Sequence, residues 1–194
     1  MAKKESVVPF EEALKNLLLW FKTVPAKGVV IGGVAASLLG QPRTTLDIDA
    51  LVLMDISEWE NFLNVGVKFG FLPRRKEALA FAKRNRVLLM QHQPSGTDID
   101  ISFGALPFEK ETIKRSKHFK IGHLSIPLPT PEDLVIMKAV AHRTKDMMDI
   151  ETILQAHPKM DLKRVLKWVK EFADFLEKPE IYDDLKKAIH RLRK

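Results

Sequence analysis

The chain has 194 residues, of which 45% are hydrophobic and 29% are charged, so its composition excludes intrinsic disorder and is typical of a folded globular protein. No apolar run approaches the roughly 20 residues that a bilayer requires, and the N-terminus lacks an apolar signal core, so we expect a cytoplasmic protein without a membrane span. The absence of cysteine excludes disulfides, thiolate catalysis and cysteine-bound zinc. The net charge of +7 favours polyanionic partners.

Hydrophobic periodicity, interrupted by proline and glycine, predicts helices and strands that alternate up to about residue 128. In chain order the predicted elements are a helix over Phe10–Phe21, a strand over Val29–Ile31, a helix over Val34–Leu39, a strand over Leu46–Met54, a helix over Ser57–Gly70, a helix over Lys76–Asn85, strands over Val87–Gln91 and Thr97–Phe103, a helix over Phe108–Ser116, and strands over Phe119–Ile121 and Leu124–Ile126. The turn residues Pro94–Gly96 predict that the two strands around them form a hairpin.

The character of the sequence changes at the prolines 127, 129 and 131, after which the pattern is helical throughout. It predicts one continuous helix from Pro131 through Asp149, a helix with an apolar stripe from Leu162 to Leu176, and a last helix from Pro179. The predicted fold class is therefore α/β (α+β), in which residues 1–128 form a core with a mixed sheet flanked by helices. Residues 129–194 are expected to form an all-helical region packed on or beside that core.

The segment Asp47-Ile48-Asp49 places two carboxylates on one face of the predicted strand, because side chains alternate along a strand. Two adjacent carboxylates repel each other unless a cation lies between them. Oxygen ligands alone favour magnesium or manganese over zinc. The alternative interpretation is a pair of solvent-facing aspartates on an edge strand.

A second pair, Asp98 and Asp100, repeats this arrangement in the predicted strand over Thr97–Phe103. If that strand lies beside Leu46–Met54, three or four carboxylates converge on one face of the sheet. Polymerases and nucleases use two metal ions in such a setting to clamp the attacking and leaving oxygens of phosphoryl transfer.

Gly32 and Gly33 lie between a predicted strand and a predicted helix. Glycines at such a position let backbone N–H groups approach a phosphate, and the helix dipole favours its negative charge. A plain turn is the alternative interpretation of this pair.

The glycine pair followed by Arg43-x-Thr45-x-Asp47-Ile48-Asp49 resembles the nucleotidyltransferase superfamily of DNA polymerase β, over roughly residues 28–150. Within it, the block is similar to the minimal AbiEii-type branch, which includes bacterial toxin nucleotidyltransferases and antibiotic-modifying relatives. The resemblance implies that Asp47 and Asp49 are catalytic metal ligands. For the third carboxylate Asp100 fits better than Asp98, because it lies deeper in the strand. At residue 33 this chain has glycine, whereas many members of the superfamily carry serine at the matching position.

On a continuous helix Lys138, His142, Lys145 and Asp149 fall in one narrow stripe. Lys138 is surrounded by apolar residues, so its ammonium either reaches the surface along its stem or faces an anion in a cleft. His142 is either a general base or a structural histidine. The segment from Arg143 to Asp149 is similar to the Arg/Lys-Asp-x-x-Asp block of AbiEii-type proteins, which implies contacts to nucleotide phosphates or to the acceptor. The expected nucleotide-binding residues are Gly32, Gly33, Arg43, Thr45, Lys138 and Lys145.

Basic residues gather between Arg74 and Arg86 and again over residues 186–194. Each group is either a phosphate-binding surface or a solvated helix face and tail. With the resemblance, they predict a nucleotidyltransferase that uses Mg²⁺ or Mn²⁺ and a nucleoside triphosphate. RNA or tRNA is the favoured acceptor, in a toxin role that implies a cognate antitoxin, and a protein or a small molecule such as an antibiotic is the alternative acceptor. The alternatives are a catalytically inactive module of the same fold that binds RNA or a protein partner, and a different metal enzyme such as a phosphoesterase.

Overall fold

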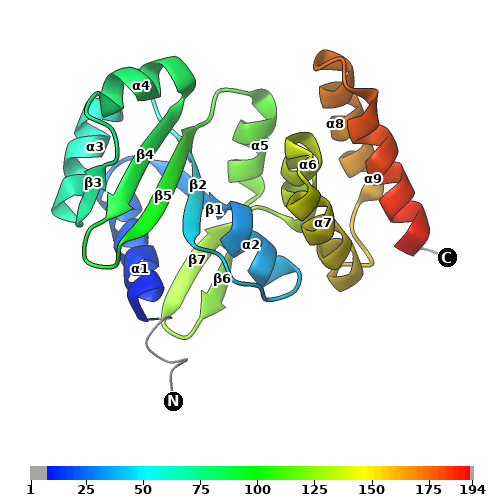
Figure 1. Cartoon of the computed structure of the whole chain (residues 1–194), viewed down its shortest axis with the longest axis horizontal. Coiled ribbons are helices and arrows are strands. Elements are labelled where there is room, and N and C mark those ends of the chain that lie inside the picture. The colour runs from blue at the N-terminus through cyan, green and yellow to red at the C-terminus, as the bar shows by residue number, and fades with distance from the viewer. Residues whose placement is uncertain (1–7, 193–194) are drawn as a thin grey trace. The chain divides into compact units, whose positions relative to one another are not determined.

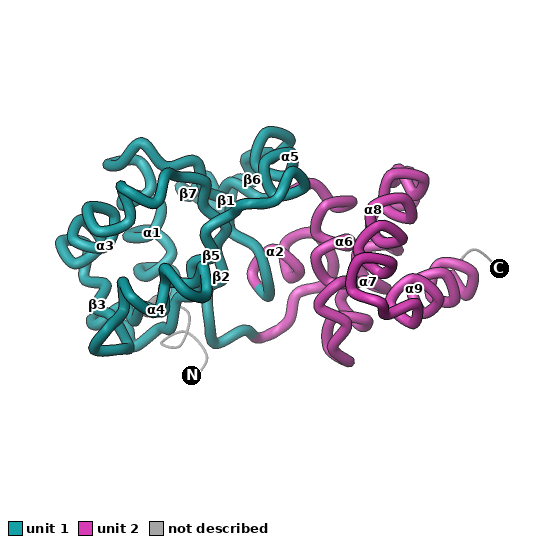
Figure 2. Tube along the Cα trace, turned by 90° about the horizontal axis from the view of Figure 1, so that it is seen from above, with its two compact units in different colours: residues 1–33, 45–128 teal, residues 34–44, 129–194 magenta. Residues whose placement is uncertain are grey.

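The computed structural model describes residues 8–192 and divides the chain into two compact units (Figure 2). The first unit comprises residues 1–33 and 45–128, and the second comprises residues 34–44 and 129–194. Residues 1–7, on which the expectation of no signal peptide rests, lie outside the described residues, as do Arg193 and Lys194 of the C-terminal basic group. Within residues 8–192, no helix is both long enough and apolar enough to cross a membrane.

A five-stranded mixed sheet forms the centre of the first unit (Figure 1). In spatial order it consists of β1 (Lys27–Ile31), β2 (Asp47–Leu53), β5 (Thr97–Phe103), β4 (Val87–His92) and β3 (Phe71–Pro73). β2 and β5 run parallel, and the other neighbours are antiparallel. The predicted fold class is therefore confirmed, as are the hairpin of β4 and β5 and the placement of the two aspartate strands side by side.

The edge strand β3 has no counterpart among the predicted elements. Three residues, one of them proline, are too few to show an alternating pattern. Proline is tolerated at an edge because its missing N–H removes no ladder hydrogen bond there. Phe71 pairs with His92 of β4, and the backbone N–H of Arg74 donates to the carbonyl of Leu89 at 3.0 Å, so the pairing continues one residue past the strand.

The two faces of the sheet differ in character. One face is apolar and fully buried, and its central residues are Ile48, Ala50, Ile99, Ile101, Leu88 and Met90. The helices α1 (Val8–Thr23) and α3 (Trp59–Lys68) cover it: Trp20 stacks on Phe62 at 4.3 Å, and Trp59 stacks on Phe103 of β5 at 3.9 Å. The opposite face carries the aspartates. The first unit also contains α4 (Ala78–Asn85) and α5 (Pro107–Arg115).

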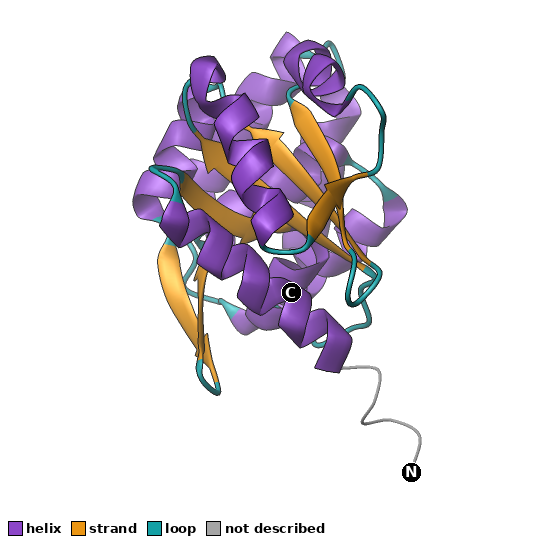
Figure 3. Cartoon of the chain, turned by 90° about the vertical axis from the view of Figure 1, so that its left-hand side faces the viewer, coloured by secondary structure: helices purple, strands orange, loops and turns teal. Residues whose placement is uncertain are grey.

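A separate two-stranded ribbon consists of β6 (Lys117–Ile121) and β7 (Leu124–Leu128), and it extends past the five-stranded sheet (Figure 3). Its antiparallel pairing, with Phe119 opposite Ile126, confirms the two short strands that the sequence predicts in this region.

The second unit is helical within its described residues. It contains α6 (Pro131–Ala141), α7 (Thr144–Ala156), α8 (Leu162–Phe175), α9 (Pro179–Leu192) and, from residue 34 onward, α2 (Gly32–Leu39). α6 packs against α7 and α8, and α8 packs against α9. This arrangement confirms the predicted helical C-terminal part.

The continuous helix predicted from Pro131 through Asp149 is wrong. α6 ends at Ala141, and His142 takes a left-handed backbone conformation with φ 51°. The His142 N–H donates to the carbonyl of Lys138 at 3.0 Å, which closes the last turn of α6 and lets α7 begin in a new direction. The stripe predicted for Lys138, His142, Lys145 and Asp149 therefore does not exist.

Candidate active site

Four aspartates lie in register on the two parallel strands at the centre of the sheet. Asp47 of β2 is opposite Asp98 of β5, and Asp49 is opposite Asp100. Their neighbours Ile48 and Ile99 are fully buried, whereas all four aspartates are half-buried. The apolar residues fix the register, because a slip by one residue would bury the carboxylates in the core.

The same row of the sheet continues to Arg74, the residue directly after the edge strand β3. Leu89 of β4 is opposite Asp100, and the Arg74 backbone bonds to Leu89. Arg74, Leu89, Asp100 and Asp49 are therefore successive members of one row across four strands. Residues opposite each other in a sheet project to the same face, so the Arg74 side chain is directed to the face of the aspartates.

The Arg74 guanidinium bridges the two aspartates of β5. Its Nη1 donates to Asp98 Oδ2 at 3.0 Å, and its Nη2 donates to Asp100 Oδ1. The other oxygen of Asp98 accepts from Gln91 Nε2 at 3.1 Å. Asp98 thus has hydrogen-bond partners at both oxygens. Reasoning from sequence placed Arg74 only in a basic cluster, since no local spacing signals a contact across 26 residues.

Electrostatics distinguish Asp100 from an ordinary surface carboxylate. Burial raises the pKa of Asp100, and the negative charges of Asp47 and Asp98 raise it further. The positive charge and hydrogen bond of Arg74 lower the pKa but do not cancel the increase. A group of like charges in this environment gains from the arrival of a cation.

Gly32 lies against the carboxylate of Asp49 at the start of α2. Its φ of +62° is a conformation that side chains other than glycine rarely adopt, and a Cβ built on it would lie 1.8 Å from Asp49 Oδ2. A side chain at residue 32 would therefore displace the carboxylate. Gly33 follows in the first turn of α2, which begins two residues earlier than the sequence predicts.

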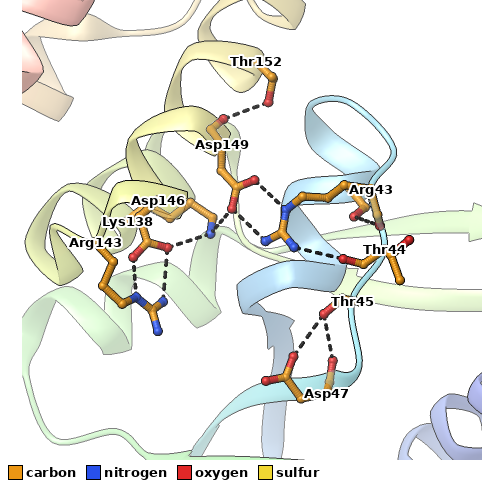
Figure 4. A network of polar contacts seen from close by, with 10 residues as sticks. Arg43, Thr44, Thr45, Asp47, Lys138, Arg143, Asp146, Asp149 and Thr152 are labelled. Carbon is orange, nitrogen blue, oxygen red and sulfur yellow. Dashed lines mark hydrogen bonds and ion pairs between the residues drawn. The ribbon is translucent and has the colours of Figure 1, made fainter.

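Thr45 holds the other aspartate of β2. Its hydroxyl donates to Asp47 Oδ1 at 3.0 Å (Figure 4). The structure thus places Asp47, Asp49, Asp100, Gly32 and Thr45 together in the first unit.

The donor set fits a divalent cation by its chemistry and register. Carboxylate oxygens are the ligands that Mg²⁺ and Mn²⁺ prefer. Because residue 32 is a glycine, no side chain at that position covers the Asp49 carboxylate. As the side chains stand, however, no three His, Asp or Glu groups within residues 8–192 are arranged to hold a metal ion. The oxygen of Asp100 that Arg74 contacts is already engaged.

A second polar cluster, in the second unit, contains two more of the predicted nucleotide-binding residues, Arg43 and Lys138 (Figure 4). Lys138 Nζ donates to Asp146 Oδ1 at 3.1 Å and to Asp149 Oδ2 at 2.7 Å. Arg43 donates to Asp149 through Nε at 2.7 Å and through Nη2 at 2.9 Å. Arg143, whose side chain is exposed, donates to Asp146 Oδ2 through Nε at 2.5 Å. We call these five residues the Lys138 network.

The inner members of the Lys138 network are almost without solvent contact: Asp146, Lys138 and Asp149 are 0%, 4% and 5% exposed. Burial by itself raises the pKa of both aspartates. The hydrogen bonds and positive charges of Arg143 and Lys138 on Asp146, and of Arg43 and Lys138 on Asp149, outweigh this effect, so both pKa values lie below the usual range. Both carboxylates are therefore ionised in the native protein at neutral pH.

The structure gives the remaining predicted residues separate surroundings. Lys145 is exposed in the first turn of α7. His142 lies 3.2 Å from Asp184 on α9. In the basic group between residues 74 and 86, Arg75 lies 4.3 Å from the ring centroid of Phe81. Arg86 donates to the backbone carbonyls of Phe103, the last residue of β5, at 2.9 Å and of Gly104 at 3.0 Å.

Glycines that open a helix, followed by paired aspartates on adjacent strands of a mixed sheet, define a nucleotidyltransferase-type fold. A family model described as "Nucleotidyltransferase of unknown function (DUF6036)" matches residues 11–192. Because this match spans most of the chain, the protein belongs to that family. The predicted superfamily and enzyme class are confirmed, whereas the AbiEii-type branch stays a prediction.

Solved structures with the same fold have low sequence identity to this chain. The antibiotic-resistance factor ANT(2'')-Ia has a TM-score of 0.60 at 11% identity, covering 88% of this chain and 95% of that one. The lincosamide antibiotic adenylyltransferase LnuA has a TM-score of 0.53 at 15% identity, covering 75% and 96%. An antigenic nucleotidyltransferase-like protein from Paracoccidioides brasiliensis has a TM-score of 0.53 at 14% identity, covering 90% and 91%. A search of curated proteins found no match.

Proposed function

We propose that this nucleotidyltransferase moves a nucleoside monophosphate from a triphosphate to an acceptor hydroxyl with the help of Mg²⁺ or Mn²⁺. The acceptor oxygen forms a bond to the α-phosphorus, the bond between that phosphorus and the bridging oxygen to the β-phosphate breaks, and pyrophosphate leaves. The observation that carries the proposal is the register of Asp47 and Asp49 with the strand of Asp100 on one half-buried face. Such a reaction needs positioning and charge neutralisation more than covalent chemistry.

Each residue of the first unit has a role in this proposal. Asp47, Asp49 and Asp100 hold the metal, which neutralises phosphate charge when bound. Thr45 orients Asp47 through its hydroxyl, and the backbone at Gly32 and Gly33 faces the triphosphate. Asp100 also accepts the proton of the acceptor hydroxyl, a role that its raised pKa supports.

For the second unit we propose a division of roles. Arg43 connects the segment before β2 to α7 through Asp149, and Lys138 connects α6 to α7 through Asp146 and Asp149. Because their charges are directed to these aspartates, we assign Arg43 and Lys138 a structural role in place of the nucleotide contact that the sequence predicts. Lys145 is exposed and stays our candidate for a contact to the nucleotide phosphates.

For the acceptor we propose RNA, with tRNA as the first choice, in a toxin of the AbiEii-type branch that has a cognate antitoxin. The net charge of +7 supports this choice, as do the exposed side chains of Lys76, Lys83 and Arg84. Two of the structural neighbours modify small molecules, tobramycin in one case and a lincosamide in the other. A neutral or basic small acceptor gains nothing from a basic surface.

A labelling experiment tests this function. The protein is incubated with each α-³²P nucleoside triphosphate, with Mg²⁺ or Mn²⁺, and with total RNA, purified tRNA, tobramycin or lincomycin. We expect label in tRNA, only with metal, and none with the Asp47→Asn/Asp49→Asn double variant. Label in an antibiotic alone would overturn the RNA proposal. If no acceptor is labelled in a metal-dependent way, and none is labelled when cell extract is added as a source of further acceptors, the inactive binding module is favoured.

Metal binding itself is expected to raise the melting temperature. A ligand that binds only the native state at 100 times its Kd stabilises it by about 2.7 kcal/mol, which corresponds to about 5 °C or more for a chain of this size. Differential scanning calorimetry with and without Mn²⁺ measures the shift, which should vanish in the double variant. As a charge-matched control, Glu58→Gln/Glu60→Gln alters two exposed acids at the start of α3, the helix that covers the opposite face of the sheet, and should keep the shift. An equal shift in both double variants would place the ion elsewhere.

A further inference from the structure

We propose that Arg74 is an internal countercation of the metal site, which occupies Asp100 in the metal-free protein and must leave it when a divalent cation binds. This inference rests on the proposed metal-dependent function. It assigns different roles to the two aspartates of β5: Asp100 is the third metal ligand, and Asp98 is a positioning residue that keeps Arg74 nearby.

The sheet itself places Arg74. The hydrogen bond from its backbone N–H to the Leu89 carbonyl holds it at the edge of the row that contains Asp100 and Asp49. Its side chain is 29% exposed and extends over this row to reach both aspartates of β5. The contact is therefore a product of strand register and not of a chance surface encounter.

The two aspartates of β5 have different hydrogen-bond partners. Asp98 accepts from Arg74 at one oxygen and from Gln91 at the other, so both of its oxygens are occupied by protein donors. Asp100 accepts from Arg74 through Oδ1 and lies beside Asp49. Asp98 also lies opposite a β2 carboxylate, that of Asp47, but protein donors occupy both of its oxygens, whereas Arg74 contacts Asp100 at Oδ1. This difference in bonding, and not the distance to β2, favours Asp100 as the ligand.

Arg74 and a bound divalent cation would repel each other at Asp100. A guanidinium at Asp100 and a divalent cation between Asp49 and Asp100 would be like charges a few ångströms apart, and they would compete for the same oxygens. This competition explains why the carboxylates do not form a ready three-ligand centre within the described residues. Asp98, to which the guanidinium already donates at 3.0 Å, would remain as its partner after displacement from Asp100.

The test measures Mn²⁺ affinity without nucleotide, using the electron paramagnetic resonance signal of free Mn²⁺ during a titration. The variants are Arg74→Gln, which removes the charge, and Arg74→Lys, which keeps it. Arg75→Gln is the matched control, because Arg75 is the neighbouring arginine and stacks on Phe81. We expect Arg74→Gln to bind Mn²⁺ about tenfold more tightly than the wild type, equivalent to about 1.4 kcal/mol. Arg74→Lys should remain within about threefold of the wild type, and Arg75→Gln should be unchanged.

The outcomes separate this inference from the function on which it rests. Wild-type binding together with equal or weaker binding by Arg74→Gln would overturn the countercation role and leave the metal site intact. Tighter binding by Arg75→Gln to the same degree would overturn it as well, because the effect would then be one of general charge. No Mn²⁺ binding by any of the four proteins would overturn both the inference and the proposed metal dependence. Thermal unfolding of each variant confirms that it is folded.

Discussion

Replacing Asp49 with asparagine is expected to abolish nucleotidyl transfer while leaving the protein folded. Loss of groups that only orient metal ligands costs about 10- to 100-fold, so we expect the loss of a ligand itself to reduce the rate at least about 100-fold. Asparagine has the shape of aspartate and fits against Gly32 without a new contact. Because it removes one charge from a group of like charges, the free energy of unfolding should be unchanged or slightly higher. Pyrophosphate release and thermal unfolding measure the two effects.

The matched control for Asp49→Asn is Asp183→Asn, the same change at an exposed position of α9. It should keep the wild-type rate. A wild-type rate in Asp49→Asn would remove Asp49 from the metal site, and a reduced rate accompanied by a lower melting temperature would indicate a structural role instead.

Replacing Lys138 with methionine is expected to produce the largest loss of stability. Methionine fills a similar volume but leaves Asp146 and Asp149 without their shared buried cation. Removing one partner of a buried ion pair typically costs about 3–5 kcal/mol, and denaturant unfolding measures that difference. Lys145→Met changes the same residue type at an exposed position of α7 and should change stability by at most about 0.5 kcal/mol. Equal effects of the two substitutions would contradict the structural role of Lys138.

The pH dependence of stability provides a second measure of the Lys138 network. The pKa values of Asp146 and Asp149 are lower in the folded protein than in the unfolded chain. Their contribution is therefore present above the unfolded value of about 3.9 and is lost as the pH falls through the lower folded values. In Lys138→Met both pKa values rise, so acid unfolding should begin at a higher pH than in the wild type. An unchanged acid midpoint would mean that Arg43 and Arg143 alone account for the shifts.

The sequence predicts those parts of the site that depend on a short-range pattern of residue types. The alternation of aspartate with isoleucine predicts that Asp47 and Asp49 lie on one face of β2. The same pattern predicts that Asp98 and Asp100 lie on one face of β5, and the structure shows that β5 is the neighbour of β2. Proline and glycine positions predicted most boundaries. These signals depend on residues a few positions apart, for which strand and helix geometry is fixed.

The parts that the sequence does not predict depend on distant partners or on a single backbone angle. Arg43 and Asp149 are 106 residues apart in the sequence, and only the tertiary structure of the second unit brings them together. The break at His142 requires a left-handed conformation, which costs a non-glycine residue about 1–2 kcal/mol and leaves no mark on the apolar pattern around it. For the same reason Lys138 could not be assigned to an ion pair from its apolar neighbours.

The membership of segment 34–44 in the second unit has a practical meaning for dissecting this protein. The backbone passes between the units at residues 33–34, 44–45 and 128–129, so neither unit is an uninterrupted stretch of chain. A polypeptide cut after Leu128 would keep Arg43 but lose Asp149, and it would expose Gly40, whose close neighbours are Thr152 and Ile153. The carboxylate strand β2 would then follow a segment that has lost these contacts. We therefore expect C-terminal truncation at Leu128 to give an unstable fragment, so that the transferase is best studied as a whole chain.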